Sequence, residues 1–271
     1  MYNFFSKNWQ ILPIEEAKID VENVHYQYGF GVYENIKVRN QILYFVKMHI
    51  DRLLQWAKVI ELEHNFSIEF IEKNNQDLIK KLNSDSFNIK ILLLGGNTAD
   101  DAQLYILPLS PLFIDRKLYR DGVNLISTKY ERWIPNVKSL NMLPSYLIYK
   151  KAKKQWCYDG LLLDSDSNIL EWTRTNFFLV KWKTLFTAPK EKVLEWVTKT
   201  TVIQCAKENW YEIEERLIKK SDLNNFDWAF VTSTSSNILP VKKIDDFEYE
   251  KIDEKIKNLM KEYDKWLKKN N

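Results

Sequence analysis

The sequence has few of the residues that build covalently linked or metal-held frameworks. Its 271 residues include only two cysteines, Cys157 and Cys205, and three histidines, His25, His49 and His64. Two cysteines cannot form a disulfide framework or a cysteine-rich metal cluster, and the histidines are too scattered for a metal-ligand pattern. We therefore expect no metal site, and we interpret the cysteines as small buried side chains in a reducing compartment.

Long apolar runs and a large excess of one charge are also lacking. No stretch approaches the roughly 18–20 apolar residues that a membrane-spanning helix needs. The N-terminal MYNFFSKNWQ has no basic region followed by an apolar run, so it does not resemble a signal peptide. The formal net charge is only +3, which favours neither nucleic acid nor an anionic membrane as a partner. These features predict a cytoplasmic protein that binds neither.

What the chain does contain indicates a mixed α/β protein. Alternating residues at 30–38 and the apolar run at 88–94 predict strands, and 47–62 has the periodicity of an amphipathic helix. Ser67 is a candidate N-cap for a further helix, and 139–156 predicts another. The 10 Trp, 14 Tyr and 14 Phe are numerous enough to indicate a large core or an oligomer interface.

The sequence pattern changes near the middle of the chain. Polar and irregular residues at 110–137 interrupt the succession of strands and indicate a crossing loop or domain boundary. We expect a small N-terminal α/β domain at 1–118 and a larger, more strand-rich α/β domain at 119–271. No P-loop, nucleophile elbow or dinucleotide fingerprint occurs, so residue types alone predict only an α/β protein that binds a small molecule.

Six segments, taken in order, resemble those of the fold-type IV pyridoxal-phosphate enzymes. They are YGFGVYENIKV, HIDRLLQWAKVI, RWIPNVKSLNML, ILEWTRTNFFLV, LEWVTKTTVIQCA and VTSTSSNILPV, and they extend from about residue 28 to 241. This family includes branched-chain aminotransferases, D-amino acid aminotransferases and aminodeoxychorismate lyase. The resemblance covers most of the chain and implies the two-domain fold of that family, with pyridoxal phosphate as cofactor.

The resemblance also implies which residues bind the cofactor. Lys138 matches the lysine that holds pyridoxal phosphate covalently and moves the α-proton of the substrate. Glu171 matches the carboxylate that keeps the pyridine nitrogen protonated, so that the ring withdraws electrons. The phosphate needs a fixed positive charge, hydroxyl groups and a helix N-terminus. Arg52 matches the arginine that binds the phosphate, and Leu194 matches the apolar residue that contacts the cofactor ring. Val197 and Thr198 match the residues that open a helix onto the phosphate, and Thr234 and Ser235 are assigned to the other side of the phosphate.

The chain departs from the family pattern near the substrate. Tyr33 matches a residue that faces the substrate. Trp172 and Trp196 stand where the family has glycine, which indicates that the wall of the pocket is reshaped. Leu94 replaces the arginine that many lyases and D-amino acid enzymes carry, so a substrate carboxylate needs another anchor. Arg174 either serves as that anchor or points into solvent.

These residues favour an aminotransferase that exchanges an amino group between a small amino acid and a 2-oxo acid in two stages, with a branched-chain-like substrate. Two alternatives stay open at this point: aminodeoxychorismate lyase, because the lysine segment KSLN also occurs there, and a non-catalytic relative that keeps only the fold. Family members assemble their site in a homodimer, so we also expect a homodimer.

Overall fold

The computed structural model describes residues 2–194, 196–250, 252 and 254–270. The chain forms two compact units, each with its own sheet. The first comprises residues up to Leu112 together with the short segment Val137–Met142, and the second comprises Phe113–Asn136 and Leu143–Asn270. Lys138 therefore packs with the N-terminal unit. The predicted domain ranges, 1–118 and 119–271, stay a prediction.

The first unit is built on a six-stranded antiparallel sheet with the order β2-β1-β6-β5-β3-β4. Its strands are β1 (Phe4–Lys7), β2 (Gln10–Pro13), β3 (Gly31–Arg39), β4 (Ile42–Leu43), β5 (Ser86–Leu94) and β6 (Gln103–Leu109). The longest pairing joins β3 and β5 over nine residues each, with Tyr33 opposite Leu92 and Asn35 opposite Lys90. Because side chains alternate between the faces of a strand, Tyr33, Asn35, Lys90 and Leu92 all project from one face, and Glu34 projects from the other.

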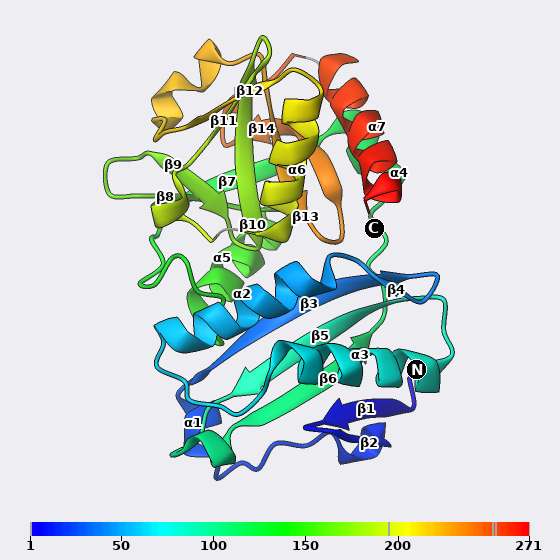
Figure 1. Cartoon of the computed structure of the whole chain (residues 1–271). Helices are drawn as coiled ribbons and strands as arrows, with labels where there is room; N and C mark the ends of the chain where they lie inside the picture. Colours follow the sequence, from blue (N-terminus) through cyan, green and yellow to red (C-terminus); the bar gives the residue numbers. More distant parts are fainter. Residues whose placement is uncertain (1, 195, 251, 253, 271) are drawn as a thin grey trace. The chain divides into compact units, whose positions relative to one another are not determined.

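Two long helices cover the Glu34 face of this sheet (Figure 1). The helical segments of the unit are α1 (Val24–Gln27), α2 (Val46–Val59), α3 (Ile68–Leu82), η1 (Ile14–Glu16) and η2 (Ala99–Asp101). α2 buries His49, Ile50 and Leu53, so its apolar stripe packs on the sheet as the sequence predicts. Ser67 caps α3 by accepting a hydrogen bond from the Phe70 amide at 3.2 Å, which confirms the predicted N-cap.

The second unit contains a nine-stranded sheet that closes on itself. Pairing of β9 with β10 completes a ring of strands in the order β10-β13-β14-β7-β8-β9, with β11 and β12 extending beyond β10. The strands are β7 (Val123–Lys129), β8 (Asp159–Leu163), β9 (Ile169–Trp172), β10 (Thr175–Lys181), β11 (Thr184–Thr187), β12 (Glu212–Glu215), β13 (Trp228–Ser233), β14 (Asn237–Ile244) and β15 (Phe247–Glu248). The apolar core of the unit lies along these strands and includes Leu161, Phe177 and Val231.

Helices pack around this second sheet. They are α4 (Arg116–Asp121), α5 (Leu143–Lys154), α6 (Val197–Glu208) and α7 (Glu254–Lys269), with two short turns, η3 (Lys190–Lys192) and η4 (Lys220–Asn225). α6 and α7 lie side by side (Figure 1), joined by a 2.7 Å hydrogen bond between the Thr201 and Tyr263 hydroxyl groups. The helix predicted at 139–156 is shorter than expected, because Ser139 pairs with Val32 of β3 instead of entering α5.

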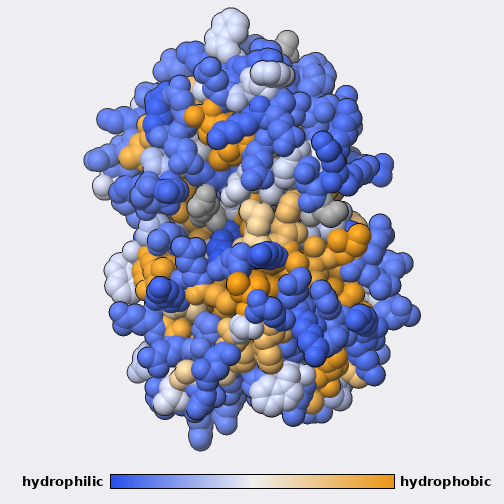
Figure 2. All heavy atoms as spheres, viewed as in Figure 1, coloured by the Kyte–Doolittle hydropathy of each residue, from blue (hydrophilic) through white to orange (hydrophobic). Residues whose placement is uncertain are grey.

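Polar residues form most of the molecular face shown in Figure 2, with hydrophobic residues gathered in patches between them. Among the helices of the described ranges, none has the length and apolar character needed to cross a bilayer. Cys205 is buried and Cys157 is partly buried, and both are free thiols.

Candidate active site

The segment Val137–Met142 lies along the edge of β3 and places Lys138 beside it. The Tyr33 amide donates to the Lys138 carbonyl at 3.1 Å, and the Leu140 amide donates to the Gly31 carbonyl at 3.0 Å. Gly31 leaves room for this approach, since a Cβ there would lie 3.0 Å from Leu140 Cδ1 in the segment and 2.7 Å from the Leu93 carbonyl oxygen of β5. These backbone contacts hold the lysine at a fixed position on the sheet.

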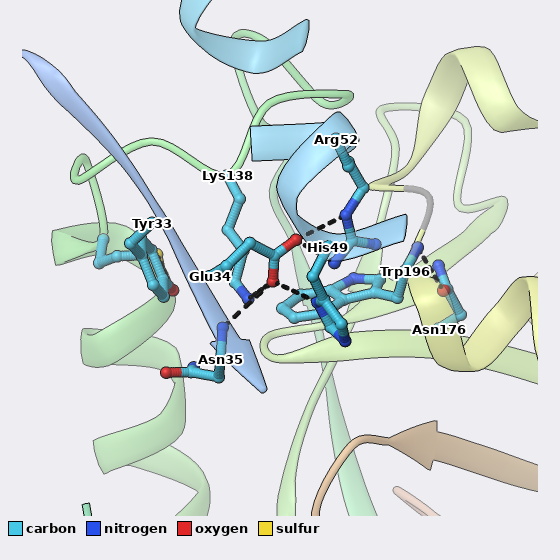
Figure 3. Close-up of polar contacts among 9 residues, drawn as sticks. Tyr33, Glu34, Asn35, His49, Arg52, Lys138, Asn176 and Trp196 are labelled. Carbon is cyan, nitrogen blue, oxygen red and sulfur yellow. Dashed lines mark hydrogen bonds and ion pairs between the residues drawn. The ribbon is translucent and has the colours of Figure 1, made fainter. Parts of the chain in front are cut away.

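The ammonium group of Lys138 belongs to a buried charge cluster centred on Glu34 (Figure 3). The carboxylate of Glu34 lies 3.3 Å from Lys138 Nζ and 3.0 Å from His49 Nδ1, and it accepts from Arg52 Nε at 2.7 Å. A second contact with the Arg52 guanidinium strengthens that pair. His49 and Arg52 are three residues apart on α2, so both side chains point to the same side of the helix.

The cluster sets the charge of its members. Burial lowers the pKa of Lys138 to about 8, against the opposing effect of Glu34, while the Arg52 charge lowers it further. Burial alone raises the pKa of Glu34, but the charges of Arg52, Lys138 and His49 together hold that pKa far below its usual range. Glu34 is therefore an ionised carboxylate at any pH near neutral, and Lys138 loses its proton much more readily than an exposed lysine does.

Tyr33 lies beside the same lysine. The Lys138 Nζ is 4.7 Å from the centre of the Tyr33 ring, and the Tyr33 hydroxyl lies 3.4 Å from Met142 Sδ. Lys138, Arg52 and Tyr33, which the sequence assigns to one site, are thus brought together within the first unit.

In the second unit, Glu171 of β9 is almost completely buried and is held by three donors. Arg132 Nε donates to its Oε1 at 2.9 Å, Trp196 Nε1 to its Oε2 at 3.4 Å, and the Leu194 amide to its Oε1 at 3.4 Å. Burial raises the pKa of Glu171, and Arg132 opposes that rise most strongly. Arg132 is itself held by the Thr173 carbonyl at 2.8 Å.

Leu194 and Trp196, which stand shortly before α6, each form a hydrogen bond with the Asn176 side chain. Asn176 Nδ2 donates to the Leu194 carbonyl at 2.8 Å, and the Trp196 amide donates to Asn176 Oδ1 at 3.4 Å. Trp196 occupies the N-cap position of α6 and makes no side-chain capping bond, so the amides of the first turn, at Val197 and Thr198, are suited to an anion.

Thr234 and Ser235 lie in the turn between β13 and β14. This turn is closed by Ser233, whose hydroxyl accepts from the Ser236 amide at 2.9 Å and lies 2.6 Å from the Ser236 hydroxyl. The structure therefore places both predicted residues on one hydrogen-bonded turn of the second unit. Their binding of phosphate or substrate stays a prediction.

Two residues that follow Glu171 in the chain, Trp172 and Arg174, pack within the second unit. Trp172 is buried and stacks on Tyr158 at 5.5 Å between ring centres, so its indole fills core. Arg174 Nε donates to the buried Asp159 carboxylate at 2.7 Å, and its guanidinium lies 4.7 Å from the centre of the Tyr149 ring. The role of Arg174 as a substrate anchor stays a prediction.

The family model for amino-transferase class IV matches residues 31–244, which span most of the chain. The chain belongs to the class IV aminotransferase family. Similar proteins include a D-alanine aminotransferase of Bacillus licheniformis, 28% identical over 250 residues, covering 88% of this chain and 87% of that protein. A probable branched-chain-amino-acid aminotransferase of Rickettsia felis is 29% identical over 249 residues, covering 88% and 86%.

Solved structures share the fold of this class IV aminotransferase. The branched-chain amino acid aminotransferase of Escherichia coli matches with a TM-score of 0.89 at 23% identity, covering 96% of this chain and 93% of that one. The branched-chain amino acid aminotransferase of Thermobaculum terrenum, in its PLP-form, matches with a TM-score of 0.87 at 22% identity, covering 100% and 95%. The predicted fold-type IV α/β fold is thereby confirmed.

Pyridoxal phosphate is the cofactor of this family, and the residues described here fit it. The first unit contains a buried amine of lowered pKa, at Lys138, and the Arg52 guanidinium in the same charge cluster, which are groups suited to an aldehyde and a phosphate. The second unit contains a buried carboxylate, at Glu171, and the α6 N-terminus, which are groups suited to a protonated ring nitrogen and to a phosphate. The binding of the cofactor by these individual residues stays a prediction.

Three residues of these clusters have no role in the sequence-based assignment. Glu34 and His49 stand inside the segments GVYE and HIDRL, and Arg132 opens the segment RWIPNVK. Each lies in a segment that resembles the family, but only the fold shows which charged group it contacts. His49 is a buried partner of Glu34.

Proposed function

We propose that this class IV aminotransferase transfers an amino group between a small apolar amino acid, of the branched-chain kind, and a 2-oxo acid. The observation that carries the proposal is the burial of Lys138 against Glu34 and Tyr33, with its pKa lowered to about 8. An amine of that pKa is partly neutral near neutral pH, as both a nucleophile and a general base require. Pyridoxal phosphate, when bound, supplies the electron sink that stabilises negative charge at the substrate α-carbon.

The residues of the chain then have separate tasks in the proposed reaction. Lys138 holds the cofactor through Nζ, and the released amine moves a proton to and from the substrate α-carbon. Glu171 keeps a proton on the pyridine nitrogen, and Arg132 favours the ionised form of Glu171 that this task requires. Arg52 binds the phosphate through its guanidinium.

The remaining predicted residues complete the cofactor site in this proposal. The first-turn amides of α6, at Val197 and Thr198, bind the phosphate together with the hydroxyl groups of Thr234 and Ser235. Leu194 packs against the pyridine ring of the cofactor, where its apolar side chain excludes water.

The preference for an apolar substrate is supported by the sheet face that carries Tyr33. Around Tyr33 this face is formed by Leu92, Leu94 and Tyr105, with Met142 packed against them. The relatives at 28% and 29% identity are named D-alanine and branched-chain aminotransferases, which makes D-alanine the second candidate substrate. The lyase interpretation is not favoured, because the matching relatives are named aminotransferases.

We further propose a homodimer and a cytoplasmic location. The homodimer is supported by an exposed apolar stripe on α5, where Leu143, Tyr146 and Leu147 are each more than half exposed. Sedimentation equilibrium tests the dimer, and a monomer at micromolar concentration would contradict it. The two free thiols suit a reducing compartment, and fractionation of cells that express the tagged protein tests the location.

The function is tested with the purified protein loaded with pyridoxal phosphate. We expect a visible absorbance band of the lysine-bound cofactor, which Lys138→Ala abolishes and the exposed control Lys58→Ala retains. Addition of L-leucine, L-isoleucine, L-valine or D-alanine in turn identifies the donor, because a transaminase converts the band to that of pyridoxamine phosphate. A 2-oxo acid then restores it.

Two outcomes would contradict the proposal. A protein that takes up no pyridoxal phosphate is not an enzyme of this kind. A protein that releases pyruvate from aminodeoxychorismate, and returns to the lysine-bound band with every turnover, is a lyase.

A further inference from the structure

The first turn of α6 contains a buried lysine, Lys199. It is the third residue of the helix, after Val197 and Thr198, and its side chain is only 1% exposed. Side chains of a helix lean toward its N-terminus, so the lysine extends back toward the beginning of α6. The first turn holds no acidic residue. A buried positive charge therefore stands at the positive end of the helix dipole.

The ammonium group of Lys199 is held between the ends of two paired strands. Its Nζ donates to the Ala188 carbonyl at 3.1 Å and forms an ion pair with the Glu215 carboxylate at 2.9 Å. Ala188 directly follows β11, and Glu215 is the last residue of β12. The two strands are parallel neighbours, with Thr187 opposite Glu215. Lys199 thus ties the first turn of α6 to the same end of both strands.

This position is an unfavourable one for a lysine. Burial removes the ammonium group from water, and the helix dipole repels a cation in the first turn of a helix. A buried ion pair is often no more stable than well-packed apolar side chains of similar volume. Stability of the core therefore gives little reason for a charge here. An anion at the same helix end gives a reason, since it attracts both the lysine and the first-turn amides.

We propose that Lys199 is a positioning residue of the phosphate-binding end of α6. Its ammonium group is already bound to Ala188 and Glu215, so it acts through the helix by holding the first-turn amides in place for the phosphate. The inference rests on the proposed function, because it takes the α6 N-terminus as a phosphate site. Glu215 is 36% exposed, so water screens its charge more than that of the buried lysine, and the helix end keeps a positive potential.

The test compares Lys199→Met with the conservative Lys199→Arg and with Lys207→Met, which removes an exposed lysine from the last turn of the same helix. Calorimetry of the cofactor-free proteins measures the binding of pyridoxamine phosphate, which forms no covalent bond with Lys138, and of pyridoxamine, which has no phosphate. We expect Lys199→Met to raise the Kd of pyridoxamine phosphate about tenfold, the effect of one interaction at a helix N-terminus. The Kd of pyridoxamine stays within about twofold. Lys199→Arg and Lys207→Met retain most of the affinity for the phosphate form.

Amide hydrogen exchange gives a second readout that needs no ligand. The Thr200 amide donates to the Trp196 carbonyl at 3.2 Å and closes the first turn of α6. In the cofactor-free protein we expect this amide to exchange faster in Lys199→Met, because the turn has lost its anchor. Lys199→Arg and Lys207→Met exchange there as the unaltered protein does. If Lys199→Met does not fold, Lys199→Gln replaces it, and its expected changes have the same direction because glutamine carries no charge.

Three results would overturn the inference. One is a lower urea midpoint in Lys199→Met with an unchanged Kd for pyridoxamine phosphate, which assigns the lysine to stability alone. Another is an equal loss of affinity for pyridoxamine and for its phosphate, and the third is unchanged exchange at Thr200. Failure of the proposed function looks different. The unaltered protein then binds no pyridoxamine phosphate, or it binds the phosphate form and transfers no amino group, and in the second case the inference about Lys199 stands.

Discussion

Replacement of Glu34 by glutamine tests whether the buried cluster sets the reactivity of Lys138. The substitution keeps the shape of the side chain but removes the negative charge 3.3 Å from Lys138 Nζ. At that separation, and with an effective dielectric constant of about 20, the attraction between the charges is about 5 kcal/mol. Arg52 and His49 share the same carboxylate, so only part of this energy acts on the lysine.

The sign of the effect follows from the charge that is removed. Glu34 stabilises the ammonium form of Lys138 and thereby raises its pKa, while burial and Arg52 lower it. Without the carboxylate, the pKa of Lys138 falls from about 8 by roughly 1 to 3 units, each unit corresponding to about 1.4 kcal/mol. At pH 7 the lysine then changes from mostly protonated to at least half neutral.

The assay is the rate at which trinitrobenzenesulfonate labels Lys138 in the cofactor-free protein, followed by peptide mass spectrometry from about pH 5 to about pH 9, a range that brackets the lowered pKa. We expect the midpoint of the rate profile to move to lower pH in Glu34→Gln. The exposed Glu63→Gln is the control and leaves the midpoint unchanged. A midpoint that stays in place or moves upward in Glu34→Gln would refute the argument.

Loss of the buried carboxylate also affects folding, since it leaves Arg52 and Lys138 without their shared partner. Breaking a buried pair in this way costs about 3–5 kcal/mol, so urea unfolding of each variant accompanies the labelling. If Glu34→Gln does not fold, His49→Gln provides a second comparison, because it keeps the charge of Glu34. Its expected midpoint lies close to that of the unaltered protein, and a large shift would contradict the role given to that charge.

Three further substitutions test the remaining contacts. Arg132→Gln removes the strongest counter-charge of Glu171, so the pKa of Glu171 rises further above its value in the unfolded chain. The folded state of the variant then keeps the Glu171 proton to higher pH, which makes the loss of stability larger at neutral pH than in mild acid. We expect the free energy of unfolding, measured in urea, to fall by about 3 kcal/mol more at neutral pH than in mild acid. Trp196→Phe removes one donor to Glu171 and shifts the same pH dependence in the same direction, by less than Arg132→Gln does. Gly31→Ala places a Cβ 2.7 Å from the Leu93 carbonyl oxygen and lowers the free energy of unfolding by about 1–3 kcal/mol, seen as a lower urea midpoint.

Much of the local structure was predictable from short-range patterns. The apolar stripe of α2 and the Ser67 cap of α3 depend on residues three or four positions apart, and both are confirmed. The start of α5 was not predictable in this way. Ser139 pairs with Val32, far earlier in the chain, and that pairing delays the helix to Leu143.

The sequence by itself pointed to Lys138, Arg52 and Glu171 as site residues, because each lies in a segment that resembles one family, and their roles stay predictions. It did not determine the partners of those groups. Glu34 contacts Lys138 across 104 residues of chain, and Arg132 contacts Glu171 across 39. Only the tertiary structure decides such contacts, since buried charges take the partner that the packing of strands and helices brings within reach.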